Sequence, residues 1–373
     1  MIGWAHKVVR RLAAEAREFR RWEALRRPAD VRAYYGWDRL PDRNGPISGG
    51  IVKCLDLAER FPNSPDKANL LYLVSSALPD RRGLLARAAR RAGGRVVLNQ
   101  NGVAYPAWAG ADWQAMNAPN ARVHARADFV VYQSEFCRRC AERFLGARKG
   151  PGEVLYNPVD TTKFRPPEVP IPFDPVRLLL AGSHHQYYRV QTAVDVLAQV
   201  RDSGIEAVLE IAGRYRWETD ERSAENSIRN YVEKQGLTAA VTFSGPYTQE
   251  QAWSLFQRAH ILIHTKYNDP CPRLVVEAMA SGLPVVYSAS GGVPELVGMD
   301  AGIGVFAPMD WESIHPPSPR GMADAVQIIV ASYKAYSKAA RRKAETKHDV
   351  QAWIDRHQQI FESLAQKETD DVR

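Results

Sequence analysis

The chain has 373 residues, of which 45% are apolar and 25% charged, and its formal net charge is +8. This is the composition of a globular protein long enough for two domains with sizeable cores. Four cysteines are too few for a disulfide framework, and apolar runs such as residues 70–74 are far too short to cross a bilayer. Basic residues interrupt the first apolar stretch, so we expect no secretory signal and a cytoplasmic location.

Positive charge is concentrated at the start of the chain. Residues 1–157 carry 27 Lys and Arg against 15 Asp and Glu, whereas the remainder carries 23 against 27. Within residues 1–27, apolar side chains from Ile2 to Phe19 fall on one helical stripe with arginines around it. This pattern fits a basic helix on the inner face of the cell membrane, or equally a helix packed on its own domain. We expect no nucleic acid, because no recognised motif accompanies the charge.

Strands and helices alternate along the first half. We expect strands at 31–37, 70–75, 95–99 and 129–133, and helices at 51–61, 84–92 and 135–144. The pair Gly49 and Gly50 ends a glycine-rich loop before the first helix, where the backbone can approach a phosphate or sugar closely, although most such pairs are only tight turns. Cys137 and Cys140 form a lone C-x-x-C, which we interpret as two buried helix residues rather than a zinc site.

The second half repeats the alternation. We expect strands at 177–181, 207–211, 241–243, 260–264 and 284–287, separated by helical patterns, and a final helix at 350–364. Strands that alternate with helices predict parallel sheets in both halves. The proline-rich stretches 166–175 and 316–319 are interpreted as a linker and a surface loop.

Two carboxylates, Asp269 and Glu277, bracket a turn that contains Pro270 and Pro272. The turn follows the strand at 260–264 and opens a helix, so it lies at the carboxyl end of a strand, where open α/β sheets bind ligands. Backbone N–H groups from Arg273 onward are available to an anion at the start of this helix. Both carboxylates can therefore face one bound molecule.

These residues carry a family resemblance. Residues 269–286, followed by the stretch from Ser290 to Val297, look like the signature of glycosyltransferase family 4, and residues 156–166 resemble the family's linker. The family consists of retaining enzymes with the GT-B fold, in which two Rossmann-like α/β domains face a central cleft. The resemblance implies an acceptor-side domain at 1–160, a nucleotide-sugar-binding domain at 161–345, and a helix at 346–373 that packs back on the first domain.

The resemblance also assigns roles to residues. Glu277 would bind the ribose hydroxyls of a nucleotide; a surface charge is the alternative, but its neighbours are apolar. Asp269 would contact the donor sugar where the family usually has Glu, and capping the turn before Pro270 is its alternative. With Arg189 these two are the expected catalytic residues. The expected donor-binding residues are Gly49, Gly50, Gly182, Ser183, His184, Arg273, Leu274, Val275 and Glu277.

The expected phosphate loop, residues 182–190, departs from the family. Where the family shows Gly-Arg and then Lys-Gly, this chain has Gly182-Ser183, and Arg189 reaches the Lys position only with a shift of one residue. Arg189 is the expected phosphate clamp, because guanidinium binds phosphate oxygens bidentately. His184 or His185 would add a contact, although an ordinary loop histidine is as plausible. The chain contains no Asp-x-Asp, so we expect neither a metal nor a cofactor.

The acceptor side is marked by Asn99, Asn101 and Tyr105, which follow a strand of the first half and could bind sugar hydroxyls; a polar loop without a ligand is equally plausible. No general base is expected there. The prediction is a metal-independent retaining glycosyltransferase that moves a sugar from a nucleotide-diphosphate sugar to a hydroxyl of a glycan or lipid-linked saccharide, in cell-surface polysaccharide biosynthesis. A nucleotide-sugar epimerase and a non-catalytic nucleotide- or glycan-binding relative are the alternatives.

Overall fold

The computed structural model of the protein describes residues 16, 18–22, 31–43 and 48–366. The basic stripe predicted within residues 1–27 therefore lies largely outside the described residues, as does most of the glycine-rich loop before Gly49. The chain divides into two compact units, here called unit 1 (Met1–Leu155 and Gln351–Arg373) and unit 2 (Tyr156–Val350).

Unit 1 contains a five-stranded parallel sheet of order β1-β2-β3-β4-β5. Its strands are β1 (Ala33–Tyr34), β2 (Leu70–Val74), β3 (Arg95–Gln100), β4 (Phe129–Tyr132) and β5 (Gly152–Val154). The parallel sheet confirms the expectation, but β1 is much shorter than the predicted strand at 31–37. Gly36, at φ +85°, turns the chain away there. The three-residue strand β5 had no sequence signal.

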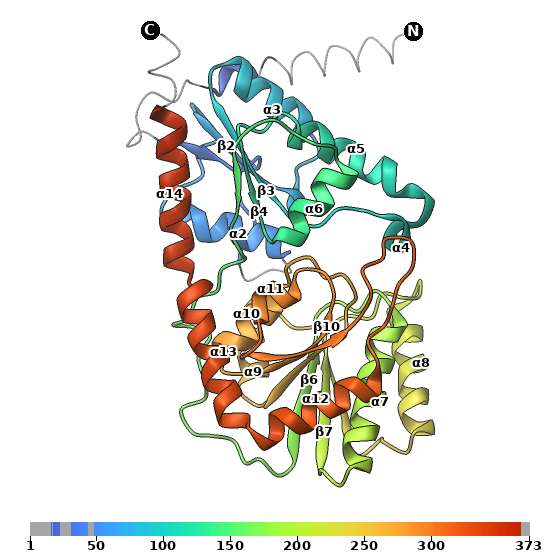
Figure 1. The fold of residues 1–373 in the computed structure, drawn as a ribbon. Helices are drawn as coiled ribbons and strands as arrows, with labels where there is room; N and C mark the ends of the chain where they lie inside the picture. Colours follow the sequence, from blue (N-terminus) through green and yellow to red (C-terminus); the bar gives the residue numbers. More distant parts are fainter. Residues whose placement is uncertain (1–15, 17, 23–30, 44–47, 367–373) are drawn as a thin grey trace. The chain divides into compact units, whose positions relative to one another are not determined.

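The helical elements of unit 1 lie between these strands and after them (Figure 1). They are α2 (Gly49–Ala58), η2 (Ser75–Ala77), α3 (Arg82–Arg91), α4 (Pro106–Ala109), η3 (Gly110–Asp112), α5 (Trp113–His124), α6 (Glu135–Phe144) and α14 (Val350–Gln366). Cys137 and Cys140 are buried in α6, as predicted. Every residue of β2 is buried, as in a strand covered on both faces.

A buried chain of hydrogen bonds joins α14 to this sheet. His357 Nδ1 lies 2.9 Å from the carbonyl oxygen of Trp353, so Nδ1 carries the proton and Nε2 accepts from the Tyr72 hydroxyl at 2.9 Å. The same hydroxyl accepts from Asn99 Nδ2 at 3.0 Å, and Asn99 Oδ1 accepts from Gln133 at 2.5 Å. The chain runs through β2, β3 and the end of β4, and satisfies polar groups that would otherwise destabilise a buried position.

Unit 2 contains a six-stranded parallel sheet of order β11-β10-β9-β6-β7-β8. Its strands are β6 (Val176–Ala181), β7 (Ala207–Ala212), β8 (Val241–Gly245), β9 (Ile261–His264), β10 (Val285–Ala289) and β11 (Gly302–Phe306). The first five confirm the predicted strands within two residues at either end. The edge strand β11 had no assigned range, because two glycines and an 83% exposed Phe306 give it no strand-like apolar pattern.

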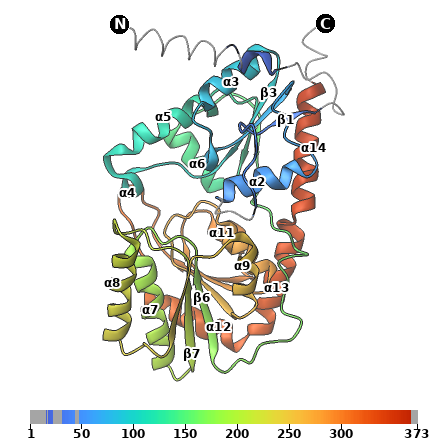
Figure 2. The ribbon, with the colours of Figure 1, turned by 180° about the vertical axis from the view of Figure 1, so that it is seen from behind.

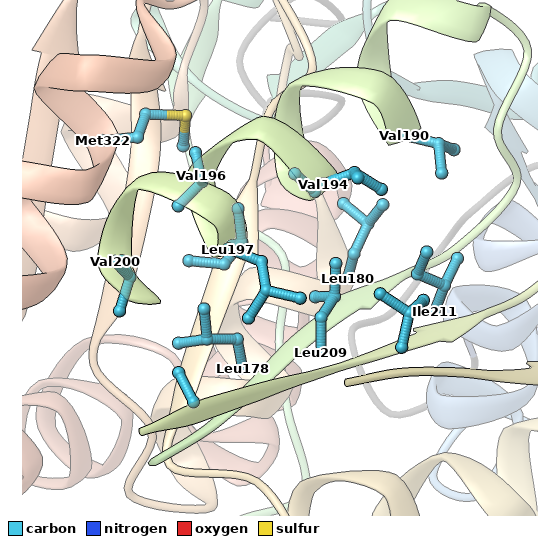
Figure 3. Packing of buried hydrophobic residues seen from close by; sticks show 14 of the residues in the cluster. Leu178, Leu180, Val190, Val194, Val196, Leu197, Val200, Leu209, Ile211 and Met322 are labelled. Atoms are coloured by element: carbon cyan, nitrogen blue, oxygen red, sulfur yellow. The ribbon is translucent and has the colours of Figure 1, made fainter. Parts of the chain in front are cut away.

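The core of unit 2 lies between this sheet and the helices α7 (Tyr187–Asp202), α8 (Glu221–Lys234) and α12 (Pro319–Ala331). Figure 3 shows side chains of α7, such as Val194 and Leu197, packed on Leu178 and Leu180 of β6 and Leu209 of β7. Helix α12 lies in front of the strands in Figure 1 and behind them in Figure 2, so it covers one face. Pro319, predicted in a surface loop, is instead the first residue of α12.

The remaining helices of unit 2 are α9 (Gln249–Phe256), α10 (Arg273–Ala280), α11 (Val293–Val297) and α13 (Tyr333–Lys347). The strand order defines where a ligand can bind. The chain moves outward from β6 through β7 to β8, then returns to the other side of β6 with β9. The order therefore reverses between β6 and β9, and the loops that follow these two strands flank a topological switch point.

Candidate functional site

The loops after β6 and β9 are held together at the switch point of unit 2. The Thr265 hydroxyl donates to the carbonyl oxygen of Arg189 at 2.8 Å, and the Tyr267 N–H donates to the Tyr188 hydroxyl at 3.0 Å. Both contacts join the residues that follow β9 to the first turn of α7. The two loops are thus one structural element, and a side chain on either one is placed relative to the other.

A glycine also brings the loops after β6 and β7 together. Gly213, at φ +122°, approaches the backbone of Gly182 so closely that a Cβ there would lie 1.8 Å from the Gly182 oxygen. Beyond it, the His184 N–H donates to the Arg214 oxygen, and the Arg216 N–H donates to the His184 oxygen, both at 2.8 Å. Any side chain at position 213 would force the loop after β6 to move.

Asp269 is a buried carboxylate between two basic side chains. Its Oδ2 accepts from His264 Nε2 at 3.0 Å, and its Oδ1 lies 3.1 Å from Lys266 Nζ. Burial alone would raise the pKa of Asp269, but the ion pair with Lys266 and the hydrogen bond from His264 outweigh it and hold the pKa below its usual range. Asp269 is therefore ionised at every ordinary working pH.

The stretch from Ser290 to Gly292 supports the backbone around Asp269. Ser290 Oγ accepts from the Asn268 N–H at 2.8 Å, and the Gly292 N–H donates to the Asp269 oxygen at 2.9 Å. A Cβ on Gly291, which has φ +69°, would lie 2.4 Å from the Asp269 oxygen. This gives the first glycine of the motif a physical reason: Gly291 lets the loop after β10 pack on the Asp269 backbone.

Glu277 lies inside α10 with its side chain only 5% exposed. Its Oε1 accepts from Arg273 Nε at 2.9 Å and from Gln249 Nε2 at 2.7 Å. Tyr247 is close as well, since burial and then the charge of Glu277 raise the pKa of Tyr247. Tyr247 and Gln249 were not predicted, and no sequence pattern links the loop after β8 to a helix 28 residues further on.

Arg189 and His184 are placed differently from the expectation. Arg189 is 4% exposed, and its guanidinium donates to the Ser183 oxygen at 2.5 Å, so it braces the loop from inside. His184 is fully buried and stacks on Tyr215; its Nε2 donates to the Ala212 oxygen at 3.2 Å. Burial lowers the pKa of His184 to about 3, so the neutral ring offers no further donor to an anion. Its exposed neighbour His185 is the better candidate.

The other expected donor residues of unit 2 surround the start of α10. A Cβ on Gly182 would lie 3.8 Å from Leu274, so the loop after β6 adjoins this helix. Arg273 forms the ion pair with Glu277. Val275 is fully buried and its N–H donates to the Pro272 oxygen at 3.2 Å, which leaves that N–H engaged within the turn.

Five expected site residues lie in unit 1. Asn99 is fully buried within the chain of hydrogen bonds described above, so it holds the sheet together rather than facing a ligand. Asn101 follows β3, with its N–H bonded to Ser75 Oγ at 2.7 Å, and Tyr105 precedes α4 with 8% exposure. Gly49 has open space at its Cβ position, whereas a Cβ on Gly50 would lie 2.7 Å from Ala77 Cβ. Gly50 therefore allows α2 to approach η2.

Two properties concern the described residues as a whole. Within residues 16, 18–22, 31–43 and 48–366, no group of three or more His, Cys, Asp or Glu side chains could hold a metal ion. Over those same ranges, no helix has the length and apolar character needed to cross a membrane.

Comparison with protein families shows a match within unit 2. The model of glycosyl transferases group 1 matches residues 162–343, which span most of unit 2 and include Arg189, Asp269 and Glu277.

Curated relatives are distant. The colanic acid biosynthesis glycosyltransferase WcaL of Escherichia coli, described as putative, is 24% identical over 148 residues (38% of this chain and 35% of that protein). D-inositol 3-phosphate glycosyltransferase of Corynebacterium aurimucosum is 30% identical over 108 residues (29% and 24%), and glycogen synthase of Mycobacterium tuberculosis is 24% identical over 254 residues (64% and 57%). The chain thus matches between about a quarter and just over half of the length of these relatives.

Solved structures match this chain over most of its length. Sucrose-phosphate synthase from Thermosynechococcus elongatus matches with a TM-score of 0.64 at 18% identity, covering 80% of this chain and 74% of that one. Anabaena HepE, in complex with UDP-glucose, matches with a TM-score of 0.59 at 18% identity, covering 86% and 81%. These are GT-B proteins, and the two parallel-sheet α/β units confirm the GT-B fold for this chain.

Proposed function

We propose that the protein is a metal-independent retaining glycosyltransferase of family 4, which transfers a sugar from a nucleotide-diphosphate sugar to a hydroxyl of a glycan or lipid-linked saccharide. The observation that carries the proposal is Glu277: a buried carboxylate in α10, beside the switch point of the sheet, within the segment that matches glycosyl transferases group 1. A carboxylate in this place suits the two hydroxyls of a ribose, because it accepts hydrogen bonds only.

The proposed reaction requires no protein side chain to act as a general base. In the proposed reaction the bond between the sugar C1 and the diphosphate oxygen breaks, and a bond from C1 to the acceptor oxygen forms on the same face. The acceptor proton passes to the departing phosphate, so no general base is required. The protein must hold the donor and stabilise the negative charge on the leaving diphosphate, which fixed cations and helix N-termini can do.

Asp269 would contact the donor sugar. It is ionised and held by His264 and Lys266, so its carboxylate offers acceptors of fixed orientation to sugar hydroxyls. The family's longer Glu is absent, and a second function is therefore considered: a nucleotide-binding relative without transferase activity. The specific observation in its favour is the phosphate loop, where Ser183 occupies the position of the family's Arg and Arg189 matches the Lys position only with a shift of one residue.

Two measurements decide between these functions. The midpoint temperature of thermal unfolding is first measured with uridine, guanosine and adenosine diphosphates. A midpoint that rises with only one of them identifies the donor base. The matching nucleotide sugars are then incubated with saccharide acceptors, and proton NMR reports the anomeric configuration of the product. Retention supports the proposal, inversion refutes the mechanism, and binding without turnover favours the binding relative. Change in the donor alone would indicate an epimerase.

A further inference from the structure

We propose that Lys266 holds the donor diphosphate, in place of the arginine and lysine that the family carries in the loop after β6. The inference rests on the proposed function and deepens it, since it names the cation that its donor site uses. The loop after β6 does not itself present an exposed cation at these positions. Ser183 and Tyr188 are uncharged, and Arg189 is buried against the Ser183 carbonyl.

The fold brings Lys266 to the place where the missing cations would act. Lys266 is the second residue after β9, and β9 pairs with β6 in the sheet. Its neighbours on either side in the sequence, Thr265 and Tyr267, are the two residues that bond to the first turn of α7. The Lys266 backbone is therefore fixed beside the phosphate loop, although the residue follows a different strand.

Exposure separates Lys266 from the two buried charges beside it, Asp269 and Arg189. Its side chain is 33% exposed, whereas Asp269 is 9% exposed on the same measure and Arg189 is 4% exposed as a residue. An ammonium group has three N–H donors, so Lys266 can keep its ion pair with Asp269 and still bind a phosphate oxygen. A ligand approaching from solvent would meet this ammonium before it met the two buried charges.

The local charge balance supports an anion. Asp269 contributes one negative charge, and Lys266 and Arg189 contribute one positive charge each. Burial, and then the positive charges of Lys266, Arg189 and Arg216, lower the pKa of His185, so this exposed histidine lies within reach of their charges. The ionised Asp269 alone would repel a diphosphate, and Lys266 is its ion-pair partner. In the proposed site Lys266 therefore offsets this charge and also binds a phosphate oxygen itself.

The test compares a nucleoside diphosphate with its nucleoside by calorimetric titration. The ratio of the two dissociation constants is the diphosphate advantage, and the base is chosen as the one that the wild-type protein prefers. Lys266→Met is expected to lower this advantage about 10- to 100-fold and to leave nucleoside affinity nearly unchanged, because one charge-assisted contact is lost. Lys266→Arg should retain most of the advantage. The matched control is Lys234→Met, which removes an exposed lysine at the end of α8 and should leave the diphosphate advantage unchanged.

A double variant separates binding from charge compensation. If Lys266 only neutralises Asp269, then Lys266→Met combined with Asp269→Asn restores the diphosphate advantage; our proposal expects the loss to persist. Restoration, an unchanged advantage in Lys266→Met, or an equal loss for nucleoside and diphosphate would each overturn the proposal. A wild-type protein without any diphosphate advantage would instead refute the proposed function itself, and the role of Lys266 with it. Near-ultraviolet circular dichroism confirms that each variant is folded, and Lys266→Gln replaces the methionine variant if that one is not.

Discussion

Replacing Glu277 by glutamine changes a charge at nearly constant shape, and its consequence can be worked out from the contacts of the carboxylate. Glutamine keeps one oxygen that can accept from Arg273 and Gln249, so the fold should survive. The buried ion pair with Arg273 becomes a hydrogen bond from a charged guanidinium to a neutral amide oxygen, which we expect to lower the free energy of unfolding by about 1–2 kcal/mol.

The loss in ligand binding should be larger and specific to the ribose. A charge-assisted hydrogen bond contributes about 1.5–3 kcal/mol, so Glu277→Gln should weaken binding of the nucleoside diphosphate roughly 10- to 150-fold. The same titration with the 2′,3′-dideoxy nucleotide isolates the contact. Wild type should discriminate strongly against the dideoxy ligand, whereas Glu277→Gln should bind both ligands with similar affinity.

The matched control is Glu210→Gln. Glu210, on β7, accepts from Arg258 Nε at 2.8 Å and is partly buried, so the substitution removes the same kind of pair from the middle of a strand. It should leave both affinities unchanged. If Glu277→Gln loses equal affinity for the ribose and dideoxy ligands, or loses none, Glu277 does not bind the ribose and the reasoning from its position fails.

Three further predictions concern metal, membrane and pH. Transfer should proceed in excess EDTA at close to its normal rate, and a loss that magnesium restores would contradict diphosphate binding by side chains alone. Deleting residues 1–27 should abolish flotation with anionic vesicles at low salt, since each basic residue near such a surface contributes about 1 kcal/mol; a full-length protein that never floats would refute the membrane interpretation. Burial lowers the pKa of His184 and His357 to about 3 and of His124 and His348 to about 4. The unfolded chain takes up these protons below pH ~6.5 and the folded chain does not, so denaturant titrations should show stability falling between pH 6.5 and 4 by about 1.4 kcal/mol per pH unit for each histidine.

The sequence predicted the parts of the fold that depend on burial. Strands covered on both faces, such as β2, are continuous apolar runs, and these were located within two residues. The strands β5 and β11 were missed because neither contains such a run: β5 has three residues and none is buried, and β11 contains two glycines and is buried only at its first residue.

Only those site residues that lie in a continuous sequence motif were predicted. Asp269 and Glu277 were identified because they share one turn and helix. Lys266 lies only three residues before Asp269 but belongs to no motif, and Gln249 comes from a segment 28 residues before Glu277, so neither partner was predicted. His184 and His185 show that the sequence did not indicate which of two adjacent side chains is buried. His184 pairs with Tyr215 in a short extended bridge, so successive side chains alternate between the interior and solvent, and of the two histidines considered from the sequence only His185 is exposed.

The position of α14 in unit 1 has a consequence for the order in which the chain can fold on the ribosome. Tyr72 and Phe61 belong to the first part of unit 1, yet they pack against His357 and Phe361, which are translated only after all of unit 2. At about 5–20 residues per second, synthesis of residues 156–350 takes roughly 10–40 s. During that time the emerging sheet of unit 1 exposes the surface that α14 later covers. Unit 2 is continuous in the chain and can fold first, so the half that begins synthesis is the half that is completed last.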